Sequence, residues 1–581
     1  MGIPEGRRAF LKFLGAGVSG AVWTAAGLPA AAATSPLMPF QPEGRAARHT
    51  DGLTFTPILP SRQDALGLPP EFTYDIVALW GDPLPGTDRR FGFNADFTAF
   101  FPIGPSGTEG VLWVNHEYAT DPKTEFSLYR QTFLAVRGHE PSVADEMHDV
   151  GGSVLHLTRV HGRWTVTPSP LTRRYDAFST LRPTGPALAQ AGSVGGTLAN
   201  CSGCHTPWNT VLSCEENFQD LVPEAVDTAG RGTVGGRFNR NGAHFGWVCE
   251  FDPLDPDFVP VKHTALGRFR HENVALRTAP GAPVVAYMGD DRIDGHVYKF
   301  VSSARFVPGS PRNRGALLSD GRIFAAVFHD DGTGAWRELA PATPLAPHTG
   351  SPHPAIPAGA TTLGGVYASQ GAIVTDAFHA SNLAGATECG RPEDIEVHPG
   401  DQSVYIAFTA SAERGAHLFS NPYGEIWRIA EVGDGTGLRF TWSRWKAGGP
   451  NDAARAGQVF AAPDNLSFDR AGNLWLVTDM SSKALASRDP LYSTFANNGL
   501  FYVPLSGSGA GVPLQFASGP AECEMTGPSW TPDEHTLFLS VQHPGEGHGM
   551  RTSAPESRGS NWPSTVPNTP PRPGVVAIRR R

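Results

Sequence analysis

The sequence predicts an all-β protein of the β-propeller class, and three features support this prediction. Runs of apolar residues that end on a carboxylate, an asparagine or a histidine recur from residue 110 to residue 543. Glycine (67 residues) and proline (52 residues) are abundant along the chain, which favours many turns between short strands. Helical periodicity is sparse. The inner strands of a propeller converge on one axis, so we expect the polar strand ends to meet at a central site. A β-sandwich has the same local chemistry, but the repeats are too many for one sandwich.

The apolar runs that predict strands share one form, in which a buried-strand signature ends on polar residues. They lie at residues 110–117, 210–216, 244–250, 284–291, 403–409, 473–479 and 536–543. Residues 74–80 form a further extended piece, which is followed by a turn at residues 81–83. Helices are expected only in insertions, around residues 124–134 and 189–197. Residues 340–380, rich in proline, alanine, glycine and threonine, are expected to form a long excursion between blades.

The first 33 residues have the features of an export signal. Arg7 and Arg8 begin a twin-arginine box, a weakly apolar segment covers residues 13–28, and residues 31–33 offer a small-residue cleavage site. The apolar run is short, so we expect no permanent membrane span. Because the twin-arginine export machinery carries folded proteins, often with a cofactor inserted, the signal indicates a periplasmic or secreted metalloprotein.

We expect one propeller domain at residues 34–552, followed by a Pro/Ser-rich C-terminal segment at residues 553–581. The length of 581 residues alone suggests two to four domains, but large all-β folds often exceed that average. The net charge of −10 gives no electrostatic case for binding nucleic acid. It does leave carboxylates available for hard cations.

The strongest candidate site lies in residues 199–218. Cys201 lies in a Gly/Ser turn, and the strand-like run that follows ends on Glu215 and Glu216. A glutamate beside a strand is usually solvated, and an arginine beside a glutamate is usually a surface ion pair, so each motif alone is weak. Together, several carboxylates in one cleft stay ionised only if cations neutralise them. Calcium takes about six to eight oxygen ligands, and one thiolate among them suits a transition metal such as iron.

The sequence CSGCH at residues 201–205 also fits the attachment pattern of a c-type haem. Two points count against haem: it is attached to an unfolded chain outside the membrane, which conflicts with folded export, and no helical cytochrome pattern surrounds the motif. A disulfide between Cys201 and Cys204, or two free thiols, are the other possibilities.

At these residues the chain resembles the PhoX family of alkaline phosphatases. The resemblance extends from the signal to about residue 546. The matching runs are RRAFLKF, YDIVALWGDPL, FGFNADF, GVLWVNHEY, NCSGCHTPWNTVLSCEENF, GRFRHENV, MGDDRIDGHVYKFVS, DGTGAWREL, RPEDIEVHP, PDNLSFDRAGNLWLVTD and CEMTGPSWTPDEHTLFLSVQHPGE.

The resemblance implies a six-bladed propeller that hydrolyses phosphomonoesters with two ferric ions, Fe(III), and three calcium ions, Ca(II), bridged by an oxo group. Cys201 would ligate iron, and Arg391 would bind the substrate phosphate as a bidentate donor. The expected carboxylate ligands are Glu272, Glu393 and Glu524, with Glu215, Glu216, Asp291 and Asp479 as further candidates. Because a metal cluster supplies the attacking oxygen, we expect no phosphoserine intermediate.

Three departures from the family pattern lie near the expected site, and they indicate either an altered substrate preference or a paralogue that kept the propeller and lost the phosphatase activity. They are Cys204 after Gly203, residues 388–390 before Arg391, and residues 410–413. Two other functions remain open on sequence alone. One is a non-catalytic, calcium-binding propeller. The other is a calcium-dependent, lactonase-like hydrolase, because residues 464–479 resemble the strands of sugar-lactone propellers.

Overall fold

The structure is a computed structural model of the 581-residue chain. It describes residues 47–48, 54–105, 107–119, 128–189, 191–347, 355–409, 421–450, 457–481, 484–485, 491–554 and 556–581. All of them belong to one compact unit, Ala47–Arg581. The predicted export signal and the departure at residues 410–413 lie outside the described residues. Within the described ranges, no helix is long and apolar enough to cross a membrane.

Six antiparallel blades form this unit, and the prediction of an all-β propeller is confirmed. In chain order, the four main strands of the blades are β4 (Ala95–Pro102), β5 (Glu109–His116), β6 (Gly151–Val160) and β7 (Arg163–Val166); β11 (Asn200–His205), β12 (Val211–Glu215), β15 (Val248–Phe251) and β16 (Val261–His263); β17 (His271–Arg277), β18 (Pro283–Asp290), β20 (Val297–Arg305) and β21 (Gly321–Phe328); β24 (Pro392–Val397), β25 (Val404–Phe408), β26 (Glu425–Ala430) and β27 (Arg439–Ala447); β28 (Pro463–Phe468), β29 (Leu474–Thr478), β30 (Gly499–Val503) and β31 (Leu514–Ser518); and β32 (Glu524–Trp530), β33 (Leu537–Gln542), β34 (Gly574–Arg580) and β3 (Phe72–Leu79).

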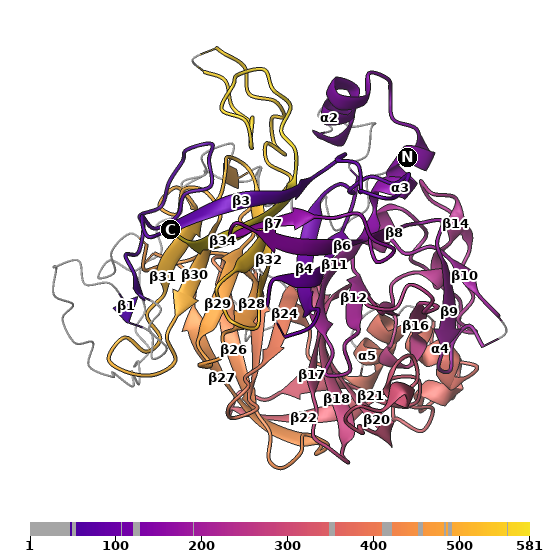
Figure 1. Cartoon of the computed structure of the whole chain (residues 1–581). Coiled ribbons are helices and arrows are strands. Elements are labelled where there is room, and N and C mark those ends of the chain that lie inside the picture. Colours follow the sequence, from indigo (N-terminus) through magenta and orange to yellow (C-terminus); the bar gives the residue numbers. More distant parts are fainter. Residues whose placement is uncertain are drawn as a thin grey trace, which may run out of the picture. The chain divides into compact units, whose positions relative to one another are not determined.

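The first strand of each blade lies innermost, and these strands form a closed ring. The strands β4, β11, β17, β24, β28 and β32 contact one another in that order, and β32 returns to contact β4 (Figure 1). A further strand, β22 (Thr333–Glu338), pairs with both β21 and β27 and so joins the third and fourth blades into one sheet. The ring brings chain segments hundreds of residues apart to a common axis.

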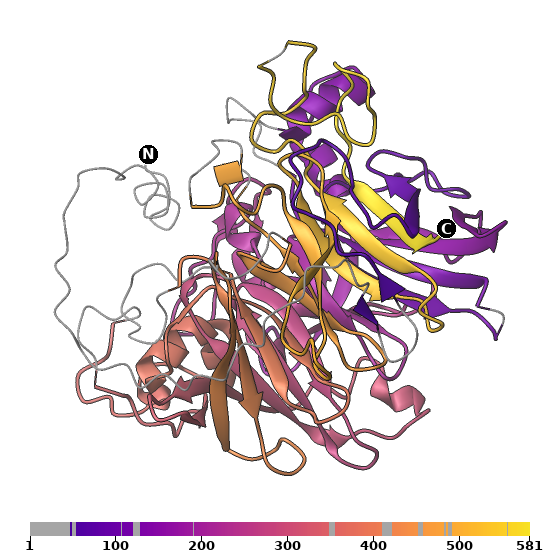
Figure 2. The same cartoon turned by 90° about the vertical axis from the view of Figure 1, so that its left-hand side faces the viewer.

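The last blade closes the ring with strands from both ends of the unit. The C-terminal strand β34, yellow in Figure 2, lies between β33 and the indigo strand β3. Leu537 of β33 lies opposite Ile578, and Phe72 of β3 lies opposite Arg580. The prediction that residues 553–581 form a separate segment is therefore wrong for β34. The run of buried residues from Gly574 to Ile578 completes the blade, although Pro/Ser-rich residues precede it.

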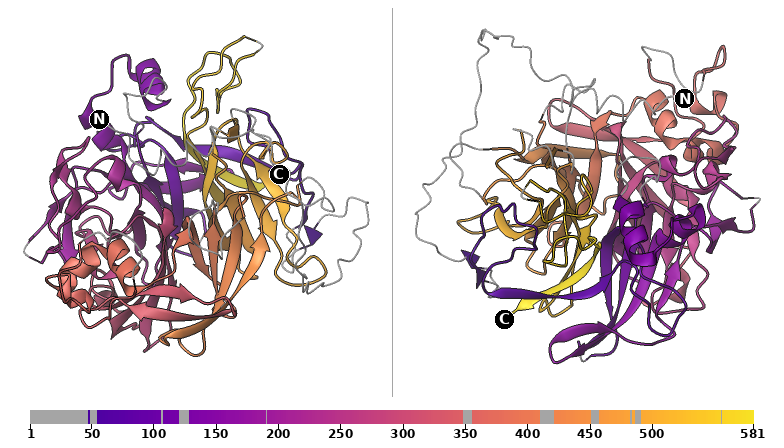
Figure 3. Two further views of the ribbon diagram at one scale, coloured as in Figure 1. Left: turned by 180° about the vertical axis from the view of Figure 1, so that it is seen from behind. Right: turned by 90° about the horizontal axis from the view of Figure 1, so that it is seen from above.

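The helices pack as insertions against the blades. The predicted helix around residues 124–134 is present as α2 (Leu128–Arg137). The described part of residues 189–197 is not helical: β10 (Val194–Gly195) lies there, and Gly196 adopts a positive φ of 91° that ends any helix. The expected excursion at residues 340–380 carries α4 (Gln370–Thr375) and the start of α5 (Ala377–Ala384) (Figure 3).

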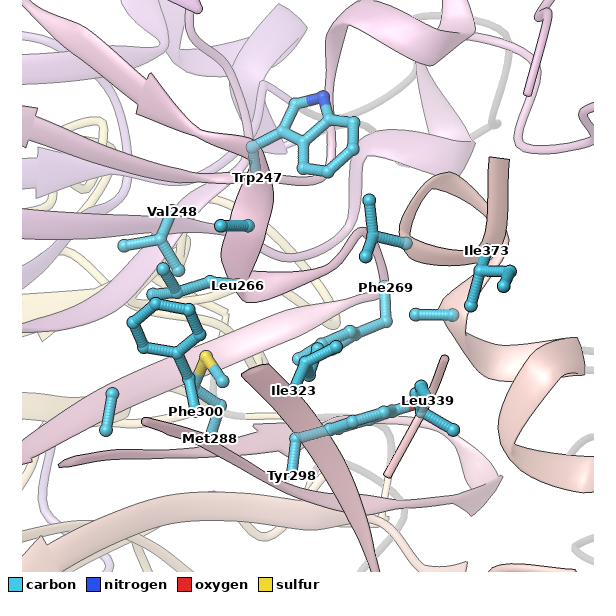
Figure 4. Packing of buried hydrophobic residues seen from close by; sticks show 14 of the residues in the cluster. Trp247, Val248, Leu266, Phe269, Met288, Tyr298, Phe300, Ile323, Leu339 and Ile373 are labelled. Carbon is cyan, nitrogen blue, oxygen red and sulfur yellow. The ribbon is translucent and has the colours of Figure 1, made fainter. Parts of the chain in front are cut away.

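The largest hydrophobic cluster joins α4 and α5 to the second and third blades. Phe269 stacks on Tyr298 with 3.9 Å between ring centroids, and Ile373 of α4 packs into the same cluster (Figure 4). Burial of such side chains contributes about 1.5–3 kcal/mol each. The core of the third blade therefore supports the loops at the axis from one side.

Strand register determines which residues meet at the axis. In every blade the first residue of the inner strand pairs with the last residue of the second strand. The pairs are Ala95 with His116, Asn200 with Glu215, His271 with Asp290, Pro392 with Phe408, Pro463 with Thr478, and Glu524 with Gln542. The start of each inner strand and the end of its neighbour thus lie at the same end of the ring.

Candidate metal centre

Each inner strand contributes one buried acid or thiol at its first or second residue. These six residues are Asp96, Cys201, Glu272, Glu393, Asp464 and Glu524. The largest relative exposure among them is 9%, for Glu524. Ligand atoms of Asp96, Glu117 and Cys201 lie within 4.8 Å of one another, as do those of Cys201, Glu216 and Glu272, and those of Glu272, Glu393 and Asp464. We call this group, with the residues that follow the second strands, the axial centre.

A second set of polar residues follows directly after the second strand of each blade. These residues are Glu117, Glu216, Asp291, Thr409, Asp479 and His543. A hydrogen-bond donor links the two sets: Gln542 Nε2 donates to Asp96 Oδ2 of the first set at 2.7 Å and to Glu117 Oε2 of the second set at 3.2 Å. His543 Nε2 lies 3.3 Å from Glu524 Oε2. The two sets together surround the axis with oxygen, nitrogen and sulfur atoms.

The backbone before the inner strands turns these side chains toward the axis. In five blades the residue two positions before the axial acid or thiol has a left-handed conformation. These residues are Asn94, Ala199, Arg391, Ala462 and Glu522, with φ between 45° and 57°. In the first five blades the ladder also changes register across the axial residue, between the residue before it and the second residue after it. Such bulges commonly re-aim a side chain next to a functional site.

The axial centre holds more negative groups than its own side chains can neutralise. The Cys201 sulfur lies 3.2 Å from both carboxylate oxygens of Glu272. Burial and then the neighbouring carboxylates raise the pKa of both groups well above their usual range. Asp96 Oδ1 and Glu216 Oε1 are buried without a hydrogen-bond partner. A buried, unpaired carboxylate oxygen is costly, so these residues fit bound cations and form a candidate metal centre.

Arg391 is the one guanidinium or ammonium group that pairs with the axial carboxylates among the described residues. Its Nε and Nη2 donate to Asp291 Oδ1 at 2.9 Å and Oδ2 at 2.8 Å, and Nη2 also lies 2.8 Å from Glu393 Oε1. Its Nη1 makes no hydrogen bond to any residue that the structure describes, and the side chain is 29% exposed. The guanidinium is thus held on one edge and open on the other.

The structure places most of the predicted site residues together and separates one. Cys201, Glu216, Glu272 and Glu393 lie in the three groups of mutually close ligand atoms. Glu524 and Asp479 interact electrostatically with each other and with Asp464, and Asp291 binds Arg391.

Glu215 is not part of the axial centre. Its carboxylate makes a fully buried ion pair with Lys262 at 2.6 Å and accepts the backbone N–H of Gly246 at 2.9 Å. Successive side chains of a strand point to opposite faces, so Glu216 faces the axis and Glu215 faces the interior of its blade. Glu215 therefore has a structural role in the second blade.

Three members of the groups of mutually close ligand atoms were not predicted: Asp96, Glu117 and Asp464. Two signals could have found them. Glu117 ends a strand in the same way as Glu216, and Asp96 and Asp464 follow a turn at the start of an inner strand. The six inner strands carry their acid or thiol at equivalent positions, but this is seen only when the strands of the blades are aligned by their pairing register.

In the structure, Cys201 and Cys204 of the motif at residues 201–205 do not form a disulfide and do not face the same site. All six cysteines are free thiols. Cys201 faces the axial carboxylates, whereas Cys204 packs against the large hydrophobic cluster. The two sulfurs therefore have different surroundings.

Comparisons with known proteins give a matching family and a similar solved structure. A family model described as alkaline phosphatase PhoX matches residues 53–545. The solved structure of Pseudomonas fluorescens PhoX in complex with vanadate, a transition state analogue, is 30% identical, with a TM-score of 0.73 over 90% of this chain and 98% of that chain.

Other solved structures are only distantly similar. The gluconolactonase XC5397 from Xanthomonas campestris is 10% identical, with a TM-score of 0.29 over 91% of this chain and 98% of that chain. A Trichoderma reesei carbohydrate-active enzyme of family AA12 is 12% identical, with a TM-score of 0.26 over 73% of this chain and 97% of that chain. These TM-scores are too low to inform the fold or the site. A comparison with curated proteins gave no match.

Proposed function

The chain belongs to the PhoX family of alkaline phosphatases and is a phosphomonoester hydrolase, and we propose that the axial centre is its active site. One observation supports this location above all. Six inner strands from all parts of the chain each place an acid or a thiol at one end of the ring, next to an arginine with an open edge. This arrangement combines a metal site with a guanidinium that can donate hydrogen bonds to a phosphate.

We infer that the metals are Fe(III) and Ca(II). The Cys201 sulfur is the one soft ligand in the three groups of close ligand atoms, which suits iron. The many carboxylate oxygens, including those of Glu272, Glu393 and Asp464, suit calcium. When bound, such ions neutralise the phosphate oxygens and lower the pKa of water, which supplies the attacking oxygen.

The protein's own residues bind and orient the substrate. Arg391 presents Nη1 to a phosphate oxygen, while Asp291 and Glu393 hold its other nitrogens. A planar guanidinium fixed in this way orients the phosphate with little loss of rotamer freedom on binding. Phosphoryl transfer depends mainly on such positioning and on charge stabilisation. The residues 388–390, where the chain departs from the family pattern, include the short strand β23 (Cys389–Gly390) directly before Arg391.

We propose that the protein works outside the inner membrane, in the periplasm or after secretion. The box at Arg7 and Arg8 supports transport by the twin-arginine export machinery. Export in the folded state allows the metals to be inserted before transport. The substrates are then phosphate esters found outside the cytoplasm.

Removal of the metals is expected to abolish hydrolysis. After treatment of the purified protein with a calcium chelator, the rate of p-nitrophenyl phosphate hydrolysis should fall at least about 100-fold, because metal ions supply several kcal/mol of transition-state stabilisation. Added calcium should restore the rate. Iron and calcium are measured in parallel by elemental analysis.

The same assay separates the other functions that the sequence left open. Bound calcium without iron and without turnover would support a non-catalytic propeller. Hydrolysis of a sugar lactone but not of the phosphate ester would support a lactonase. Full phosphatase activity in metal-free protein would contradict the proposal.

A further inference from the structure

An ion-pair cluster is joined through backbone hydrogen bonds to the pair formed by Asp291 and Arg391. It consists of Arg270, Glu224 and Arg292, and we call it the Glu224 cluster. Glu224 comes from the loop that follows the second blade's strand β12, whereas both arginines flank strands of the third blade. The cluster thus connects two blades next to the axial centre.

Glu224 binds both arginine side chains at once. Its Oε2 accepts Arg270 Nη2 at 2.8 Å, and its Oε1 accepts Arg270 Nε at 3.2 Å and Arg292 Nη1 at 3.1 Å. Burial alone would raise the pKa of the Glu224 carboxyl, but Arg270 and Arg292 lower it to about 2. The guanidinium of Arg292 also lies 3.7 Å from the ring centroid of Phe378. Both arginine side chains are therefore fixed in place.

The same two arginines hold Arg391 and its partner Asp291 through their main chains. The Asp291 N–H donates to the Arg270 carbonyl at 3.0 Å, and the Arg391 N–H donates to the Arg292 carbonyl at 3.2 Å. Between them, β19 (Ile293–Gly295) pairs with β23 directly before Arg391. A shift of either arginine would therefore displace Asp291, Arg391 or both.

We propose that Glu224 is a positioning residue for phosphate binding, because its carboxylate fixes the two arginines whose carbonyls hold Asp291 and Arg391. The inference rests on the proposed role of Arg391 in binding phosphate. Glu224 itself contacts no axial carboxylate through any hydrogen bond or ion pair found among the described residues. It acts through the geometry of the loops.

The variant Glu224→Gln tests this proposal. The amide keeps the size of the side chain but cannot accept from both arginines as a carboxylate does, so the Arg391 loop should loosen. We expect the KM for p-nitrophenyl phosphate and the Kd for inorganic phosphate to rise about tenfold, because small displacements at a bound substrate are costly. The kcat should change less than about threefold, with metal content and melting temperature retained.

Electrostatics alone makes the opposite prediction. The substitution removes a negative charge near the phosphate, so without a positioning effect phosphate should bind more tightly. An unchanged or lower Kd for phosphate would therefore overturn the proposal. Arg270→Lys, which keeps the positive charge, is measured beside Glu224→Gln. If both variants lose their metals or fail to fold, the cluster has a purely structural role, and this outcome would also overturn the proposal.

Two further variants complete the test. Asp227→Asn is the matched control, because Asp227 makes an exposed ion pair with Arg231 in the same loop and lies outside the cluster. It should leave both constants unchanged. Arg391→Ala separates the two proposals: if it does not alter the Kd for phosphate, the role of Arg391 is wrong; if it does while Glu224→Gln does not, only the role of Glu224 is wrong.

Discussion

Replacement of Cys201 by serine is expected to remove iron from the protein and to lower kcat/KM for a phosphomonoester at least about 100-fold, because loss of even an outer partner of a metal site costs 10- to 100-fold. The sulfur lies within 4.8 Å of ligand atoms from Asp96 and Glu117, and also from Glu216 and Glu272. A serine hydroxyl does not ionise in such surroundings and is a poor ligand for a transition metal. Elemental analysis and the visible absorption of the iron–thiolate bond measure the loss.

Cys204→Ser is the control for this substitution. Cys204 lies on the same strand but packs against the hydrophobic cluster instead of the axial carboxylates. It should keep iron, colour and activity. If Cys201→Ser retains a full complement of iron, the sulfur is not a ligand and the assignment of the centre fails.

Replacement of Arg391 by alanine is expected to lower kcat/KM about 1,000-fold, in line with the loss of an arginine that stabilises phosphoryl transfer. Within the described part of the chain, Arg391 is the one guanidinium at the axial centre, and its Nη1 is available to donate to a phosphate. The metals should remain, because Arg391 donates to carboxylates that the ions also neutralise. Steady-state kinetics and elemental analysis are measured on the same sample.

Arg391→Lys sharpens the interpretation of this result. Lysine keeps the charge but cannot hold Asp291 and a phosphate oxygen with one planar fork. We expect it to recover only a small part of the lost kcat/KM. A parallel fall in metal content in Arg391→Ala would instead mean that Arg391 is part of the metal site's framework and that its assignment to the substrate is wrong.

The sequence predicted the blade architecture well because strand ends carry a local signal. Apolar runs that finish on an acid are readable without knowing what they pair with, and Glu216, Asp291 and Asp479 lie at the ends of such runs. The closing strand β34 was missed because its apolar run, at Gly574–Arg580, is short and follows a Pro/Ser-rich stretch. Its place in a blade depends on pairing with β3, almost 500 residues earlier in the chain.

The site was harder to predict than the fold, because its details depend on backbone direction. Glu215 and Glu216 are adjacent and chemically identical, yet only the strand pairing decides which one faces the axis. Asp96 and Asp464 lie two residues after the left-handed residues Asn94 and Ala462. Asparagine is common in that conformation but alanine is not, so no single residue type marked the turn.

The central claim is that six blades assemble one iron- and calcium-binding centre that binds phosphate beside Arg391. A crystal structure of natively exported protein with vanadate, measured with anomalous scattering at the iron edge, tests it most directly. We expect iron within bonding distance of the Cys201 sulfur and the vanadate oxygens next to Arg391 Nη1. Anomalous density for iron away from Cys201, or vanadate bound away from the axial carboxylates, would contradict the account.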